Sequence, residues 1–164
     1  MGQGIDIQIL DGAGLSIAIV AARWNAPVVE PMLAAARDEL RTLGVTKIVV
    51  YRVPGAFELP FAANRLQRHC SAVIVLGAVI RGETPHFDFV AGECARGIMD
   101  LNLKDELATP VIFGVLTTND LEQANQRADP LQHNKGAEVA RAAVEMALCA
   151  RSLGSFPHVH WEKP

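Results

Sequence analysis

One short run of residues limits most strongly what this chain can fold into. Residues 72–80 (AVIVLGAVI) are all apolar or glycine and rich in β-branched side chains. A run of this length and composition predicts a strand buried on both faces, as in a parallel sheet covered by helices on each side. The chain then becomes polar at once, from Arg81 to His86. We predict that Thr84 caps a following helix, with Pro85 in its first turn, where a missing N–H loses no hydrogen bond.

This strand–turn–helix unit has a chemical consequence. It leaves backbone N–H groups at the start of a helix, where an anion binds well. His86 stands beside them, and histidine is the side chain whose ordinary pKa lies closest to neutrality. An ordinary connection with a surface histidine explains the same residues equally well. A nucleotide triphosphatase loop is excluded, because Glu83 stands where residues 77–84 would need the phosphate-binding lysine.

The same alternation of apolar runs and helical periodicity continues along the chain. Strands are expected at residues 15–22, 45–53, 72–80 and 110–116, and helices at residues 27–43, 56–68, 86–107, 120–128 and 137–153. Pro60 should kink the second helix or delay its start. Repeated strand–helix units predict a three-layer α/β/α sandwich around a four-stranded parallel sheet with right-handed crossovers, a flavodoxin-like architecture.

Composition narrows the classes of protein that remain. The net charge of −3 and the lack of a basic stripe argue against nucleic acid, and no apolar run approaches the ~18 residues of a membrane span. Three cysteines without a C-x-x-C pair predict free thiols in a reducing cytosol, so we expect a cytoplasmic protein. The 164 residues predict one domain at 15–153, an extended segment at 1–14 and a polar tail at 154–164.

The predicted strand ends bring a set of chemically useful residues together. Ligands of open parallel sheets bind beyond the carboxyl ends of the strands. Here those ends carry Trp24, residues 55–58, residues 81–86 and residues 117–119. Two aromatic rings suit a flat heterocycle, and the carboxylate of Glu58 suits ring N–H donors. Trp24 or Phe57 alone would be read as packing residues, but their shared placement favours a ligand site.

Five motifs in order resemble the 6,7-dimethyl-8-ribityllumazine synthase family. They are residues 23–25 (RWN), 53–60 (VPGAFELP), 77–88 (GAVIRGETPHFD), 113–117 (FGVLT) and 134–136 (NKG). The similarity covers about residues 12–153 in one register. It implies the penultimate step of riboflavin synthesis, in which a ribitylamino-uracil amine condenses with 3,4-dihydroxy-2-butanone 4-phosphate. It also implies that no metal and no organic cofactor takes part.

The resemblance further implies a role for each matched residue. One group would hold the pyrimidine and its ribityl chain: Trp24, Ala56, Phe57, Glu58, Ala78, Val79, Ile80 and Phe113. A second group would hold the butanone phosphate: Glu83 and Thr84 through their amides, with Arg127 and Lys135 supplying positive charge. His86 would carry protons. No serine or cysteine nucleophile is required because the substrate amine is itself the nucleophile, so orientation and proton transfer are what the protein must supply.

Two departures from the family pattern stand out. Trp24 replaces the usual phenylalanine, and the loop before the last helix reads LQHNKG at 131–136 after Asp129 and Pro130. The resemblance implies a homo-oligomer built from pentamers, alone, in pairs or as a sixty-subunit shell, and it allows association with riboflavin synthase. The loop length matches that of the shell formers, while its altered residues leave the assembly open.

Two other functions remain consistent with the residues. One is a flavin- or nucleotide-binding module that uses Trp24 for stacking but performs no chemistry, and such a module has no need of His86 beside a phosphate site. The other is a structural shell protein, based on the alanine-rich face of the last helix.

Overall fold

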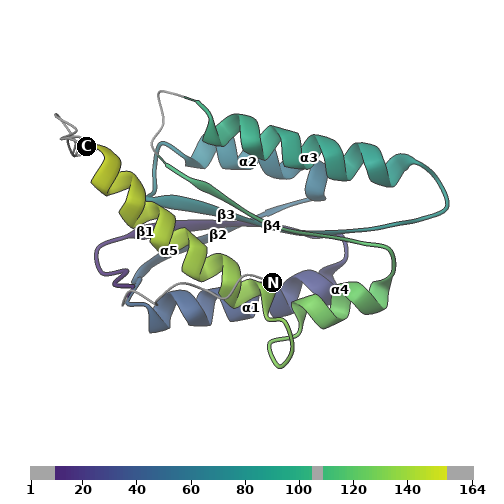
Figure 1. Cartoon of the computed structure of the whole chain (residues 1–164), viewed down its shortest axis with the longest axis horizontal. Helices are drawn as coiled ribbons and strands as arrows, with labels where there is room; N and C mark the ends of the chain where they lie inside the picture. Colours follow the sequence, from purple (N-terminus) through teal and green to yellow (C-terminus); the bar gives the residue numbers. More distant parts are fainter. Residues whose placement is uncertain (1–9, 105–108, 155–164) are drawn as a thin grey trace, which may run out of the picture.

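The molecule consists of three layers, with a parallel sheet between two layers of helices (Figure 1). The structure is a computed structural model, and it describes residues 10–104 and 109–154. The strands are β1 (Ser16–Ala22), β2 (Lys47–Val53), β3 (Ala72–Ile80) and β4 (Val111–Thr118). The helices are α1 (Ala26–Thr42), α2 (Leu59–Leu66), α3 (His86–Asn102), α4 (Leu121–Ala128) and α5 (Lys135–Gly154), with a short 3-10 turn, η1 (Ala56–Glu58), before α2.

The four strands lie in the order β2-β1-β3-β4, and all of them run parallel. The predicted sheet is therefore confirmed. β3 pairs with β1 on one side and with β4 on the other, so its backbone is satisfied on both edges. Its residues are buried over nearly the whole length, as the apolar run predicts. Since all strands point the same way, their carboxyl ends lie together at one end of the sheet.

Alternate residues of the strands enter two separate hydrophobic clusters. Ile17, Ile19 and Ile74 pack under α1, α4 and α5, whereas Val73 and Val75 pack under α2 and α3. Figure 1 shows these helix groups on opposite faces of the sheet. The period of two along each strand thus produces the three layers. No helix in the described ranges is long and apolar enough to cross a membrane.

Several predicted boundaries are confirmed, and others shift. Pro60 is tolerated because α2 begins at Leu59, so the proline lies in the first turn. α3 ends at Asn102 rather than near residue 107, because the Asn102 side chain exchanges two hydrogen bonds with the backbone of Val111 at the start of β4. α5 begins at Lys135, two residues before the predicted start. The predictions for residues 1–9, 105–108 and 155–164 lie outside the described residues.

The contact between α1 and α5 depends on a glycine. α5 crosses α1 at its first turn, where a Cβ on Gly136 would lie only 2.2 Å from the carbonyl oxygen of Met32 and 2.9 Å from the Cβ of Ala35. A side chain at this position would have to push the two helices apart. Gly136 therefore fixes where α5 starts, and with it the position of the neighbouring Lys135.

We predict that Gly136→Ala lowers the free energy of unfolding by roughly 1–3 kcal/mol, because the methyl group overpacks the α1–α5 crossing. Denaturant unfolding at fixed protein concentration measures this loss. The matched control is Gly92→Ala on an exposed part of α3, where an added Cβ meets nothing within 4 Å. The control should be neutral or gain about 0.5–1 kcal/mol from helix propensity. Equal stability of the two variants would contradict the proposed crossing.

Candidate active site

The carboxyl ends of β1 and β3 open onto a hollow of about 220 Å³. Seven of the residues that the sequence singled out line it: Trp24, Ala56, Ala78, Val79, Ile80, Thr84 and His86. They come from four separate segments of the chain, the ends of β1 and β3, the 3-10 turn and the start of α3. We call this hollow the strand-end site. Its walls combine apolar side chains with one histidine and one hydroxyl, which suits a flat, partly apolar ligand.

Trp24 and Asn25 are held at the mouth of the strand-end site by the backbone around them. The N–H of Trp24 donates to the carbonyl of Pro54, at 3.0 Å. Asn25 has the left-handed backbone conformation (φ 57°, ψ 38°), which asparagine tolerates better than most residues. Its side-chain amide donates to the carbonyl of Ala78, at 2.8 Å. This bond ties the end of β1 to the end of β3, while the indole of Trp24 stays 69% exposed.

The turn after β2 supplies the predicted carboxylate. The Glu58 carboxylate accepts a hydrogen bond from the backbone N–H of Gly55, at 2.9 Å, and this contact holds the short 3-10 turn closed. The ring of Phe57 is 58% exposed on the outside of the same turn. Phe57 and Glu58 therefore lie at the carboxyl ends of the strands, as predicted. They are next to Ala56 in the chain, although they do not line the hollow itself.

The polar turn between β3 and α3 is braced by Arg81. Its guanidinium lies 4.2 Å from the centre of the Phe87 ring and pairs with the Asp88 carboxylate at 3.0 Å. The predicted cap is wrong: α3 starts at His86, Pro85 is its N-cap, and the side chain of Thr84 makes no capping bond. The fixed φ of Pro85 restricts the backbone at the start of α3, so the helix begins there without a capping bond from the Thr84 hydroxyl. Thr84 instead lines the hollow.

The start of α3 retains the free donors that the sequence predicts. Among the hydrogen bonds of the described residues, none uses the backbone N–H of Glu83, Thr84 or His86. These groups lie at a helix N-terminus, where the helix dipole also favours a negative charge. The turn therefore offers an anion site beside the hollow that would hold a ring.

The remaining predicted residues line a different hollow, of about 390 Å³, along the open edge of β4. Phe113 comes from β4 itself, Arg127 from the last turn of α4 and Lys135 from the first turn of α5. We call this hollow the β4-edge site. It shares no lining residue with the strand-end site. The structure thus divides the predicted residues into two groups on one chain.

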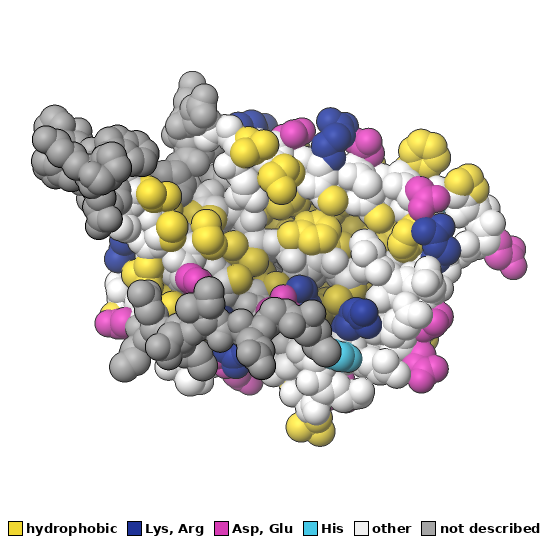
Figure 2. All heavy atoms as spheres, viewed as in Figure 1, with side chains coloured by type: hydrophobic (Ala, Val, Ile, Leu, Met, Phe, Trp, Pro, Cys, Tyr) yellow, Lys and Arg dark blue, Asp and Glu magenta, His cyan; other side chains and the backbone are white. Residues whose placement is uncertain are grey.

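Charge is distributed unevenly in the β4-edge site. Lys135 pairs with Glu138 at 2.6 Å, so part of its charge is already neutralised. No ion pair or hydrogen bond among the described residues involves the side chain of Arg127. Figure 2 shows Lys and Arg side chains at a hollowed part of this face, next to a broad apolar area. Arg127 is therefore available to bind an anion brought from outside the chain.

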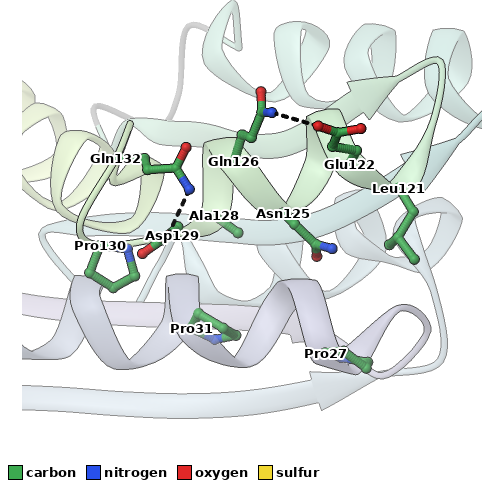
Figure 3. Close-up of a pocket in the computed structure, with 10 residues that line it drawn as sticks. All are labelled: Pro27, Pro31, Leu121, Glu122, Asn125, Gln126, Ala128, Asp129, Pro130 and Gln132. Carbon is green, nitrogen blue, oxygen red and sulfur yellow. Dashed lines mark hydrogen bonds between the residues drawn. The ribbon is translucent and has the colours of Figure 1, made fainter.

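A third hollow, of about 670 Å³, is larger than both and contains no predicted residue. Figure 3 shows it between α1 and α4, with Pro27 and Pro31 on one side and Asn125 on the other. The dashed contacts in Figure 3 are local ones, Gln126 to Glu122 and Gln132 to Asp129. Its ionisable lining residues are Glu122 and Asp129, whose carboxylates already accept local hydrogen bonds, and no cation or histidine of the described residues lines it. Size alone therefore does not mark the active site.

Comparison with known proteins identifies one family over most of the chain. Residues 14–151 match the family model of 6,7-dimethyl-8-ribityllumazine synthase. The chain is 45% identical over 152 residues to the 6,7-dimethyl-8-ribityllumazine synthase of Kineococcus radiotolerans, and 46% identical over 152 residues to that of an Anaeromyxobacter species. Each match covers 90% of this chain and 92% of the relative. The chain belongs to the lumazine synthase family. It is therefore a transferase of riboflavin biosynthesis.

Within this lumazine synthase fold, several lining residues lie outside the set to which the motifs assign a role. Asn25, Phe87 and Val90 line the strand-end site, and His133 lines the β4-edge site. Asn25 stood next to Trp24 in the first motif, so its place at a strand end was the available signal. His133 occupies one of the altered loop positions, and its backbone N–H donates to the carbonyl of Gln126 in α4 at 3.4 Å, which places it near Arg127.

We predict that Asn25→Ala lowers the free energy of unfolding by roughly 2 kcal/mol, from the lost bond to Ala78 and from the left-handed backbone. Asn25→Gly should lose only about 1 kcal/mol, since glycine adopts that backbone freely. Denaturant unfolding of the two variants measures the difference. Equal losses would show that the left-handed conformation carries no strain here.

Proposed function

We propose that the protein condenses 5-amino-6-(D-ribitylamino)uracil with 3,4-dihydroxy-2-butanone 4-phosphate to give 6,7-dimethyl-8-ribityllumazine, phosphate and water. This is the penultimate step of riboflavin biosynthesis. One observation carries the proposal: a hollow at the strand ends of a chain of the lumazine synthase family combines an aromatic platform, an adjoining anion site of free backbone N–H groups, and a histidine. A binding module would have no use for the last of these groups.

The geometry suggests how the strand-end site assists the reaction. The pyrimidine would stack on Trp24 and meet the backbone of residues 78–80, with the Glu58 side of the turn facing its ribityl chain. The phosphate of the second substrate would lie at the free N–H groups of Glu83 and Thr84. Its carbonyl would then face the substrate amine, which attacks it directly. Holding the two reactants in this relation removes much of the entropic barrier of a two-substrate reaction.

His86 is the proton carrier in this proposal. It is the first residue of α3 and lines the hollow beside Thr84. Carbinolamine formation, loss of water and departure of phosphate each need a proton to move near neutral pH, which suits an imidazole. No protein nucleophile is needed, because the amine belongs to the substrate.

We predict that the wild-type protein produces a fluorescent lumazine when both substrates are supplied. His86→Ala should lower turnover by up to roughly 10²–10⁴-fold and still leave activity above background, because positioning persists. Steady-state fluorescence measures both. The matched control is His69→Ala. His69 is an exposed histidine between α2 and the start of β3, at the amino ends of the strands. No lumazine from the wild type would contradict the proposed function, and wild-type turnover in His86→Ala would remove His86 from the mechanism.

We further propose that each active site is completed by a neighbouring subunit. The free cation Arg127 and the aromatic Phe113 lie in the β4-edge site, which is separate from the strand-end site on the same chain. Arg127 is the seventh residue of α4, so at ~1.5 Å per residue the helix carries it roughly 10 Å from its start. A rotated copy of the chain brings its own β4 edge to the strand ends of its neighbour, and a ring does this for every subunit.

This shared site implies a homo-oligomer, and we propose a pentamer as its basic unit. Exposed apolar residues support an interface on the outer face of the upper layer: Phe61 on α2 and Phe89 and Met99 on α3 are each more than half exposed. Large apolar side chains exposed on one layer are typical of an interaction surface. Pairing of pentamers, closure into a sixty-subunit shell and association with riboflavin synthase are further steps that this surface leaves open.

We predict that two poorly active variants restore each other's activity. Arg127→Ala lacks the phosphate cation, and Phe57→Ala combined with His86→Ala lacks the strand-end groups. When equal amounts are unfolded together and refolded, about one quarter of the sites in a ring should pair two intact halves. Activity should rise well above that of either parent refolded alone. Mixed oligomers, verified by mass, that stay as inactive as their parents would contradict the shared site.

A further inference from the structure

We propose that Gly55 is a positioning residue for the pyrimidine side of the site, because the Trp24 ring packs against its backbone and the Glu58 carboxylate is hydrogen-bonded to its N–H. The inference rests on the proposed function and extends it to a residue that contacts no substrate. Gly55 lies between the end of β2 and the 3-10 turn, directly before Ala56.

The backbone of Gly55 does not itself require a glycine. Its φ of −148° and ψ of −173° are those of extended chain, which every residue type adopts without strain. Its N–H makes a 2.9 Å hydrogen bond to Glu58, and a residue with a side chain could make the same bond. The reason for a glycine must therefore lie in the space where a Cβ would be.

That space is occupied by two side chains of the site. A Cβ on Gly55 would lie 3.1 Å from Cε3 and 3.5 Å from Cδ2 of Trp24, and 3.4 Å from Oε2 of Glu58. The first distance is shorter than ordinary carbon–carbon contact, so the indole would have to move. The missing side chain thus lets the six-membered ring of Trp24 lie directly against the backbone.

The contact matters because little else fixes the indole. Trp24 is 69% exposed, so it has no core packing to hold its ring. Its backbone is anchored through the bond to Pro54 and through the neighbouring Asn25, but these contacts leave both side-chain torsions free. The backbone at Gly55 is the surface that gives the exposed ring a defined orientation. Glu58, held by the N–H of the same residue, is thereby kept beside the ring.

The size of the ring makes the closest of these contacts specific to a tryptophan. The closest atom, Cε3, belongs to the second ring of the indole. A phenylalanine has no atom at that position, so it would leave room for a methyl group on residue 55. Gly55 and Trp24 should therefore act as a coupled pair, and the loss caused by a methyl group should vanish when the second ring is removed.

The test uses the full-length protein with Trp161→Phe, which leaves Trp24 as its one tryptophan. In this background Gly55→Ala should fold and assemble like the parent, since the change lies at an exposed ring. Its near-UV circular dichroism band should change because the indole turns. The KM for the pyrimidine should rise roughly 3- to 10-fold, as expected for a side chain forced off its preferred rotamer. The KM for the butanone phosphate should stay within about twofold, since that substrate lies away from the ring.

The matched comparison is the same substitution with Trp24→Phe. There, Gly55→Ala should change the KM for the pyrimidine by less than about twofold, because the two changes are coupled through one contact.

Three outcomes would overturn the inference. They are an unchanged dichroism band with unchanged pyrimidine KM, an equal loss in the Trp24→Phe background, or a Gly55→Ala protein that fails to fold. If the wild type forms no lumazine, the proposed function fails instead. The dichroism band and equilibrium titration of the pyrimidine alone still test the contact in that case.

Discussion

The structure depends on a strand that is buried on every side. β3 pairs with β1 and β4 along its edges and is covered by helices on both faces. Such a strand can leave the core only at its two ends, and a parallel sheet places its carboxyl end beside those of its neighbours. The polar residues that follow β3 must therefore meet those that follow β1. The strand-end site is the consequence of this burial.

The anchoring of the site follows the same constraint. Asn25 ties the end of β1 to Ala78 of β3, and Arg81 braces the turn that leads into α3. Both contacts are made by polar side chains at the point where the buried strands reach solvent. They give a fixed frame to residues that are themselves exposed, such as Trp24 and His86. An exposed group on a fixed frame can meet a ligand without a large loss of conformational entropy.

Much of this arrangement could be predicted from the sequence because periodicity and strand direction determine it. The run at 72–80 indicated the central strand, and the rule for parallel sheets brought Trp24 and His86 together. The cap of α3 was assigned to Thr84, since a hydroxyl before a proline fits the usual pattern, but the helix starts one residue later. The end of α3 depends on the bonds between Asn102 and Val111, which are distant contacts that periodicity does not contain.

Sequence periodicity also could not predict that the site residues would divide between two hollows. It depends on β4 being an edge strand, which leaves Phe113 36% exposed at the border of the sheet. The role of Gly55 was equally hidden in the sequence, since it depends on the contact of the Trp24 ring with the Gly55 backbone. Local patterns predict elements well, whereas the partners of exposed side chains require the folded chain.

The central claim is that one ligand is held by two chains. It is tested most directly by a crystal or electron-microscopy structure of the assembled protein with the pyrimidine substrate and inorganic phosphate bound. The account predicts that the phosphate contacts the backbone at Glu83 and Thr84 of one chain and Arg127 of its neighbour. A phosphate held by Arg127 and by the start of α3 of the same chain would contradict it.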